Sequence, residues 1–333
     1  MSTIYGVGID VSAKELTVAL PGATPESFTN DATGHRAITG LLRQQLRRGE
    51  VHVCVEATGN YSLDLCLHLQ KTEGLLVMVA NPRAVANFAK ALMSRSKTDP
   101  QDAAVLQAFA ERMPFVEWAP PSTTSLELRA AARRLDSLSN MLTRERNRLH
   151  AANATKTTNS IVRNDLKSSI KHLEGRAKRL IKTIESFIKT EPSLALSYQR
   201  LQTVCGIAER SAIKVLGELL CLPADMTARQ CVAHAGLDPR RHESGTSVRR
   251  TARISKRGNR YLRAALYMPA VVASQKDPII TVVYQNLISQ GKKPMQALVA
   301  IMRKLLHAML AMLKSQTDFD ARLLFPHIQV ENA

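Results

Sequence analysis

Residues 4–10 read Ile-Tyr-Gly-Val-Gly-Ile-Asp, an apolar stretch with two glycines that ends in a carboxylate. Short apolar runs are typical of buried strands, and residues 15–20 supply an antiparallel return. Two further β-rich runs follow, at 51–56 and 75–79. The intervening stretches have helical spacing, and we expect helices at 34–48, 61–71, 82–93 and 100–112. Strands that alternate with helices predict a layered α/β domain with its sheet covered by helices.

Charge is distributed unevenly along the chain. The 333 residues include 46 Lys and Arg against 28 Asp and Glu, a formal net charge of +18. Residues 1–120 hold 11 basic and 12 acidic residues, 121–190 hold 15 and 6, and 191–333 hold 20 and 10. A near-neutral domain followed by two basic segments indicates a catalytic unit joined to segments that hold a polyanion. It disfavours an acidic enzyme that acts on small molecules.

Nothing in the sequence predicts a membrane or secreted protein. The longest apolar runs, such as 74–80 and 264–273, are too short to cross a bilayer, and the first residues lack a signal-peptide pattern. Five cysteines without paired short spacing argue against a disulfide scaffold or a structural zinc site. We therefore expect a cytoplasmic protein with no membrane partner.

The middle segment has a heptad period. The apolar positions at this spacing are Leu128, Ala131, Leu135, Leu138, Leu142 and Leu149. After a polar break at 154–160, apolar residues resume at spacings of three and four up to Phe187. Two long amphipathic helices with a turn between them fit this pattern, either as a hairpin or as a dimerising coiled coil. Simple packing of these helices on their own domain is the alternative.

The last segment is predicted to be mostly helical. Residues 201–220 fit a helix-hairpin-helix, whose tight turn at Gly206 can present backbone N–H groups to a phosphate. A plain packing unit of two helices fits the same residues. Residues 295–313 predict an apolar core helix with one solvated edge at Arg303 and Lys304.

Four acids of the first segment lie where metal chemistry would need them. Asp10 and Glu56 each end a predicted strand, and Asp99 and Asp102 share one face at the start of a helix. Carboxylates in such positions can converge on Mg²⁺, and two such ions would clamp a phosphodiester for in-line displacement. Structural roles remain open for each acid. Asp99 before Pro100 is a good helix N-cap, Asp10 fits a turn, and Glu56 fits a capping position.

A second cluster lies in residues 239–263, where nine basic residues accompany one acid, Glu243. Gly245 next to Ser244 allows close approach of a substrate to the backbone. Flanking guanidinium groups could hold a phosphate and favour ionisation of the Ser244 hydroxyl. A basic, flexible loop whose serines only donate hydrogen bonds to phosphate is the alternative, because His242 is the one base candidate nearby. The residues that we expect to contact nucleic acid are Arg240, Arg241, Arg249, Arg250, Arg253, Lys256, Arg257 and Arg260.

An ordered set of short motifs runs from about residue 5 to residue 315. The motifs are Gly8-Ile9-Asp10 with Ala13-Lys14, Val55-Glu56-Ala57-Thr58-Gly59, Asn81-Pro82, Lys97-Thr98-Asp99 with Asp102-Ala103, Ala235-Gly236-Leu237 with Pro239-Arg240, Glu243-Ser244-Gly245, Ile254-Ser255-Lys256-Arg257-Gly258 and Leu262-Arg263-Ala264-Ala265-Leu266-Tyr267. Together they resemble the DEDD-type insertion-sequence transposases, the bridge-RNA-guided recombinases related to the Piv DNA invertases. The order of the set is specific, although no single motif is.

This resemblance implies a fold in three parts. They are a RuvC-like, RNase H-type α/β domain at 1–120, a basic helical coiled-coil linker at 121–192, and a mostly α-helical transposase domain at 193–325, with a tail at 326–333. The linker and the transposase domain would be the two basic segments described above.

The resemblance also implies roles for individual residues and partners. By matching position, Asp10, Glu56, Asp99 and Asp102 would bind Mg²⁺, and Ser244 would be the nucleophile that forms a covalent phosphoserine link to DNA. In this family two subunits supply the halves of one active site, so we expect a homodimer or homotetramer. A structured noncoding guide RNA, the bridge RNA, would pair with double-stranded donor and target DNA and set the specificity.

The resemblance thus implies an Mg²⁺-dependent, RNA-guided DNA transposase, which we expect to be bacterial and associated with the nucleoid. Two other functions remain open. A metal-dependent DNA junction nuclease would use water as the nucleophile and produce free ends without a protein–DNA adduct. A non-catalytic nucleic-acid-binding protein would use the four acids as caps and break no strand.

Overall fold

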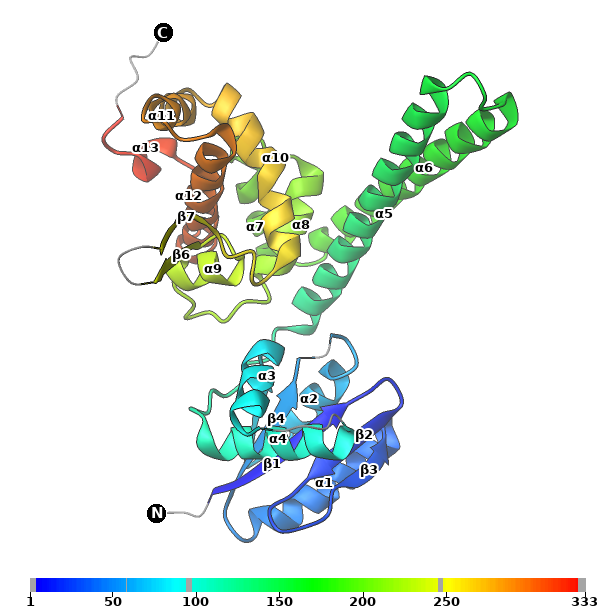
Figure 1. Cartoon of the computed structure of the whole chain (residues 1–333), viewed down its shortest axis with the longest axis vertical. Coiled ribbons are helices and arrows are strands. Elements are labelled where there is room, and N and C mark those ends of the chain that lie inside the picture. The colour runs from blue at the N-terminus through cyan, green and yellow to red at the C-terminus, as the bar shows by residue number, and fades with distance from the viewer. Residues whose placement is uncertain (1–3, 58, 94–97, 245–247, 329–333) are drawn as a thin grey trace. The chain divides into compact units, whose positions relative to one another are not determined.

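The computed structural model describes residues 4–57, 59–93, 98–244 and 248–328, with the backbone alone at 241–244 and 248–252. The chain divides into two compact units, Met1–Pro120 and Pro121–Ala333 (Figure 1). The first unit contains a five-stranded sheet, and the second is mostly helical. The prediction of a mixed α/β part followed by a mostly helical part is confirmed.

The sheet of the first unit has the strand order β3-β2-β1-β4-β5. Its strands are β1 (Ile4–Val11), β2 (Glu15–Ala19), β3 (Glu26–Thr29), β4 (Glu50–Glu56) and β5 (Leu75–Ala80). β1 pairs antiparallel with β2 and parallel with β4, and β4 pairs parallel with β5. The sequence predicted every strand except β3, an edge strand in which Phe28 is the one apolar residue.

Helices cover both faces of this sheet, as the alternating pattern predicted. They are α1 (Ala32–Leu46), α2 (Leu63–Gln70), α3 (Pro82–Ala91) and α4 (Asp99–Arg112). Val53 and Val55 of β4 share one core with α1 and α2, whereas Cys54 shares another with α3 and α4. Successive side chains of a strand point to opposite faces, so α1 and α2 lie on one face and α3 and α4 on the other.

Two glycines of β1 allow α4 to pack directly on the strand backbone. A Cβ placed on Gly8 would lie 2.0 Å from the carbonyl oxygen of Ala103 and 2.2 Å from the backbone nitrogen of Gln107. A Cβ on Gly6 would lie 2.9 Å from the carbonyl oxygen of Gln107. No other residue type fits at such an approach, so these glycines set the position of α4 along β1.

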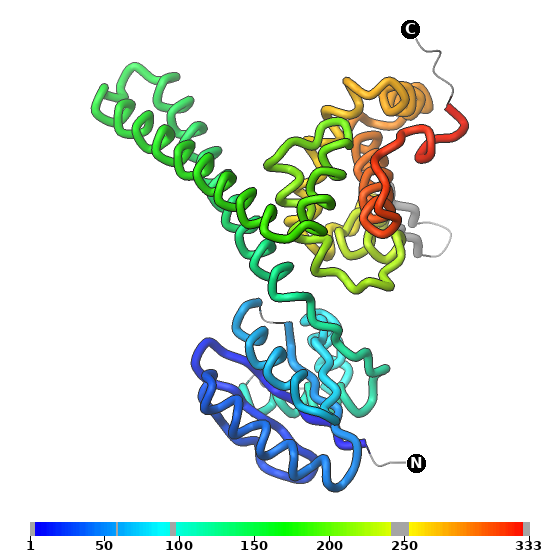
Figure 2. Tube along the Cα trace, turned by 180° about the vertical axis from the view of Figure 1, so that it is seen from behind, coloured from blue at the N-terminus to red at the C-terminus, as the bar shows by residue number. Residues whose placement is uncertain are grey.

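The second unit begins with two long helices, α5 (Thr123–Ala154) and α6 (Ser160–Lys189), which pack on each other as a hairpin (Figure 2). This is one of the two arrangements that the heptad pattern predicted. Leu138 and Leu142 of α5 form a small cluster with Leu173 of α6. Leu128 and Leu135 join the main core of the unit instead. Four of the five heptad leucines are therefore buried inside a single chain, and the fifth, Leu149, is half-buried.

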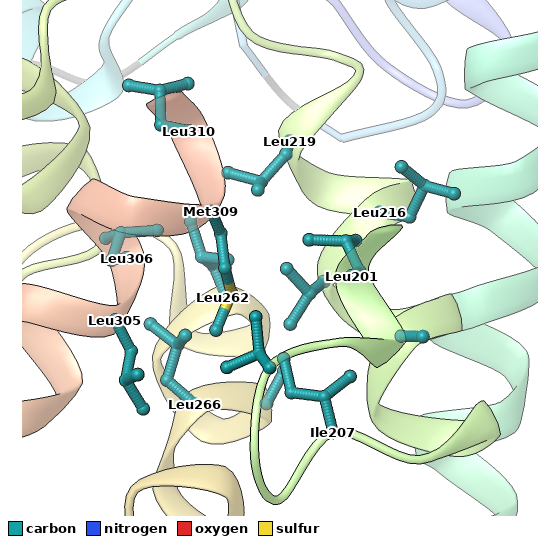
Figure 3. Close-up of a cluster of buried hydrophobic side chains, with 14 of the residues drawn as sticks. Leu201, Ile207, Leu216, Leu219, Leu262, Leu266, Leu305, Leu306, Met309 and Leu310 are labelled. Atoms are coloured by element: carbon teal, nitrogen blue, oxygen red, sulfur yellow. The ribbon is translucent and has the colours of Figure 1, made fainter. Parts of the chain in front are cut away.

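The remaining helices surround one apolar core (Figure 3). They are α7 (Pro192–Gln202), α8 (Glu209–Leu219), α9 (Ala228–His234), α10 (Arg260–Lys276), α11 (Pro278–Ser289), α12 (Pro294–Ser315) and α13 (Ala321–Leu324). By length and composition alone, α12 is apolar enough to cross a membrane. Its Leu305 and Met309 are fully buried and belong to the same core as Leu216 and Leu262, so the predicted core helix is confirmed.

Two features of the second unit bear on alternatives that the sequence left open. In place of the basic, flexible loop considered for the second cluster, the structure has two strands, β6 (Pro239–Ser244) and β7 (Val248–Ile254), which pair antiparallel as a β-hairpin. The turn between α7 and α8 is covered by α10. A Cβ on Gly206, whose φ is +88°, would lie 2.7 Å from the carbonyl oxygen of Pro269. This close contact favours the packing role for residues 201–220 over a phosphate-binding turn.

Candidate active site

Asp10 and Glu56 lie at the same edge of the sheet. In the parallel pair of β1 and β4, Ile9 is opposite Val55, so the next residue of each strand is one of the two acids. Asp10 is itself within β1 and pairs with Thr17 of β2, which excludes the turn role considered from the sequence. The carboxyl ends of adjacent parallel strands are where open α/β sheets place their ligands.

The first turn of α4 brings the other two acids to this edge. Asp99 is the first residue of α4 and Asp102 lies one turn later. The N-cap is Thr98, whose carbonyl oxygen accepts a hydrogen bond from the Asp102 backbone N–H at 2.9 Å. The expected cap role for Asp99 is therefore wrong by one residue. Since Ala103 packs on Gly8, two residues before Asp10, the start of α4 is held beside the end of β1.

The four carboxylates interact electrostatically. The pKa of Asp10 is raised from 3.8 to about 6, first by burial and then by repulsion from Asp102 and Asp99. Glu56 adds a smaller repulsion, and the backbone N–H of Val11 opposes the shift by hydrogen bonding. The repulsion that Asp10 experiences from the neighbouring carboxylates is of the kind that a bound cation would relieve.

Chemically, four carboxylates suit a hard divalent cation such as Mg²⁺, which prefers oxygen ligands. However, among the side chains that the structure describes, no three His, Cys, Asp or Glu are gathered closely enough to hold a metal ion. The donor chemistry and the raised pKa of Asp10 thus fit a cation. The coordination geometry does not follow from these positions, and the metal tetrad stays a prediction.

Ser244 is the last residue of β6, and its backbone lies opposite Val248 of β7. The side chains of Ser244, Arg241, Arg249 and Arg250 lie outside the described part of the structure. Their predicted roles therefore remain predictions.

Six basic residues of the second cluster have described side chains, and five of them are exposed: Arg240, Arg253, Lys256, Arg257 and Arg260. The sixth, Arg263, is half-buried and donates a hydrogen bond to the Ala235 carbonyl oxygen at 2.7 Å. Arg240 and Arg257 line an open cavity of about 460 Å³ beside Asp238 and Ser255, whereas Arg260 lines a different cavity. Two hydrogen bonds hold lining residues of the first cavity together. Ser255 Oγ donates to Asp238 Oδ1 at 2.6 Å and accepts from the Arg257 backbone N–H at 3.2 Å.

Sequence reasoning missed a polar network that joins α5, α8 and the start of α10. The Glu218 carboxylate accepts hydrogen bonds from Arg133 Nε at 2.7 Å, from Arg133 Nη2 at 3.0 Å and from Asn259 Nδ2 at 2.6 Å. Arg133 and Glu218 are 85 residues apart, and Asn259 is 41 residues beyond Glu218. No local pattern in the sequence signals contacts over such separations.

Comparison with known proteins identifies the family. Residues 7–152 match the family model of the IS110-type DEDD transposases, and residues 198–285 match the model described as transposase of the IS116/IS110/IS902 family. The chain belongs to the IS110 family of DEDD transposases. The first matched range contains all four acids, and the second contains Ser244.

The IS110-family transposase has relatives that align with most of its length. It is 30% identical over 303 residues to the pilin gene-inverting protein of Moraxella lacunata and 29% identical over 299 residues to that of Moraxella bovis. Each alignment covers 89% of this chain and 91% of the relative. An insertion element IS110 protein of Streptomyces coelicolor is 27% identical over 169 residues, 50% of this chain and 40% of that protein. The chain is thus a DNA transposase or recombinase.

Proposed function

We propose that this transposase breaks and rejoins DNA through a phosphoserine intermediate at Ser244, assisted by Mg²⁺ bound to Asp10, Glu56, Asp99 and Asp102. The observation that carries the proposal is the raised pKa of Asp10, which the other three carboxylates help to cause. Two strand ends and one helix start supply these acids from separate parts of the sequence. A purely structural role would not need four like charges at one edge of the sheet.

In the proposed step, Ser244 Oγ forms a bond to the phosphorus of the scissile phosphate. The bond from phosphorus to one deoxyribose oxygen breaks, and the serine proton ends on the released hydroxyl. Mg²⁺ would supply charge stabilisation for the phosphate oxygens during this displacement. Asp10 contributes in its ionised form, so its proton must leave before the cation binds. Transfer of the phosphoryl group to a partner DNA end would reverse the same bond changes without ATP.

The proposed partners are polyanions. Residues 121–190 and 191–333 carry net charges of +9 and +10, which suits donor DNA, target DNA and a structured guide RNA. The name of the Moraxella relatives, pilin gene-inverting protein, describes a rearrangement that joins two DNA sites. Two sites held together favour assembly of at least two copies of this chain, and we propose a dimer or tetramer.

The test uses protein co-purified with its RNA, Mg²⁺ and end-labelled DNA that carries the element junction, resolved on a denaturing gel. Wild type should give a labelled species at the mass of protein plus DNA. Ser244→Ala and Asp10→Asn should each abolish this species, while Asp10→Asn leaves RNA binding intact. Ser193→Ala, which removes an exposed hydroxyl at the start of α7, is the matched control and should retain the adduct.

The other outcomes separate the alternatives. Cut DNA without any adduct in wild type would indicate a nuclease in which water attacks the phosphate. Binding without cutting, repeated with RNA recovered from cells that carry the element, would indicate a protein that only binds nucleic acid. An adduct that persists in Ser244→Ala would assign the nucleophile to another residue.

A further inference from the structure

A second cavity of about 480 Å³ lies between α5 and α10, and its lining includes no residue of the β6–β7 hairpin. The polar and charged side chains that matter here are Arg133, Asp136, Asn140 and Arg144 of α5, and Arg260 and Tyr261 of α10. Three guanidinium groups therefore line the cavity against one carboxylate. Of these residues, the sequence singled out Arg260 alone.

The single carboxylate of the cavity is already neutralised. Asp136 Oδ1 accepts a hydrogen bond from Lys214 Nζ of α8 at 2.7 Å, and Oδ2 accepts one from Asn140 Nδ2 at 3.1 Å. Arg133 is likewise paired with Glu218. The surplus positive charge comes from Arg144 and Arg260, which are exposed and form no ion pair within the described residues. Two unpaired cations beside a paired acid favour an anionic ligand.

The aromatic ring of the cavity is occupied by these cations. The guanidinium carbon of Arg133 lies 4.6 Å from the centre of the Tyr261 ring, and that of Arg260 lies 4.9 Å from it. Arg260 Nη2 also donates a hydrogen bond to Tyr261 Oη at 3.0 Å. Tyr261 thus orients guanidinium groups instead of offering a free face to a nucleobase. A pre-oriented guanidinium loses less conformational entropy on binding phosphate.

We propose that this cavity binds a backbone phosphodiester of a nucleic-acid strand, held by Arg144 and Arg260. Guanidinium groups match the geometry of phosphate oxygens, and the occupied ring favours the phosphate over the base as the group recognised. A strand in this position would contact the α5–α6 hairpin and the transposase core together. The inference rests on the nucleic-acid partners of the proposed function, but not on the chemistry of Ser244.

The test measures binding of wild type and Arg144→Ala/Arg260→Ala to labelled duplex DNA and to labelled RNA at several salt concentrations. Loss of two phosphate contacts should weaken binding by about tenfold per arginine. The slope of log affinity against log salt should become shallower by about one per arginine. Tyr261→Phe, which keeps the ring but removes the hydroxyl that orients Arg260, should weaken binding by a smaller factor.

The matched control is Arg146→Ala/Arg148→Ala. It removes the same number of positive charges, both from α5, but these arginines are paired with Glu174 and Glu145 and do not line the cavity. The control should keep nearly the wild-type salt slope. An effect confined to the RNA arm or to the DNA arm would identify the strand that occupies the cavity, and an effect in both arms would show that either strand can.

Wild-type affinity and slope in Arg144→Ala/Arg260→Ala would overturn the inference, as would an equal loss in the control. Thermal unfolding of each variant separates loss of contact from loss of folding. Because the readout is binding, it stands whether or not wild type forms an adduct with DNA. Failure of this inference and failure of the proposed function are therefore distinguishable.

Discussion

Arg133 of α5 and Glu218 of α8 form a two-pronged ion pair, with N–O distances of 2.7 and 3.0 Å. The Glu218 side chain is only 3% exposed, and Asn259 supplies a third hydrogen bond to it. A carboxylate buried to this extent is tolerated because its oxygens are satisfied by charged and polar donors. The pair therefore fastens the first half of α5 to the core and to the residues that precede α10.

Glu218→Ala should lower the free energy of unfolding of the second unit by about 2–4 kcal/mol, since it leaves the Arg133 guanidinium without its partner. Denaturant unfolding measures the effect. Arg133→Met alone should also destabilise, because it leaves a buried charge unpaired. The double variant Arg133→Met/Glu218→Leu should lose much less than the sum of the single changes. Additive losses would contradict a direct pair.

Gly8→Ala should both destabilise the first unit and reduce DNA cleavage. The new Cβ would lie 2.0 Å from the Ala103 carbonyl oxygen, so α4 must move away from β1 and carry Asp99 and Asp102 with it. Overpacking of this kind costs about 1–3 kcal/mol. Thermal unfolding and the cleavage assay measure the two effects.

Gly40→Ala is the control for this change. Gly40 lies within α1, and a Cβ there would meet nothing within 4 Å. This substitution should stabilise the helix by about 0.5–1 kcal/mol and leave cleavage unchanged. Equal behaviour of the two variants would show that the contact between Gly8 and α4 does not position the acids.

Asp10 should make the first unit less stable as the pH rises. Its pKa is about 6 in the folded chain against 3.8 for the ordinary group, so the folded state binds more protons between these values. The ionisation penalty is absent below pH 3.8, grows up to about pH 6 and is complete above it. Because the group is partly exposed, solvent screening reduces the penalty to about 1–2 kcal/mol.

Asp10→Asn removes this penalty and should therefore raise the unfolding temperature at pH 7.5 but not near pH 4. Thermal unfolding of both proteins across this pH range measures the difference. Addition of Mg²⁺ at pH 7.5 should stabilise wild type more than the variant, because binding to the folded state shifts the equilibrium. An unfolding temperature of wild type that is independent of pH between 4 and 7 would contradict the repulsion at this edge.

The sequence predicts the first unit well because a strand that is covered on both faces of its sheet is apolar along most of its length. Between its terminal acids β4 is apolar except for His52, whereas β3 exposes most of its residues and leaves no such signal. The β6–β7 hairpin was missed for a related reason. Its strands carry five arginines, and basic residues in succession favour the interpretation of a solvated loop.

The functional residues likewise fall into those whose positions the sequence predicts and those whose positions it does not. Asp10 and Glu56 could be placed because the ends of adjacent strands meet at one edge, and Asp102 because it follows Asp99 by one helical turn. The partners of Glu218 could not be predicted from the sequence, since only the folded chain brings α5, α8 and α10 together. The contact of Tyr261 with Arg133 of α5 is likewise a property of packing between helices.

The hairpin of α5 and α6 has a consequence for assembly. Leu128, Leu135, Leu138 and Leu142 are already buried within one chain, so these leucines are not available to form an apolar interface with a second copy. The hairpin segment is also strongly basic, since residues 121–190 hold 15 basic residues against 6 acidic ones. Two such basic surfaces repel each other in dilute solution, but a polyanion bound between them would neutralise the repulsion and bridge them. Binding of nucleic acid would then come before assembly, because copies of the chain would associate only after the polyanion is bound.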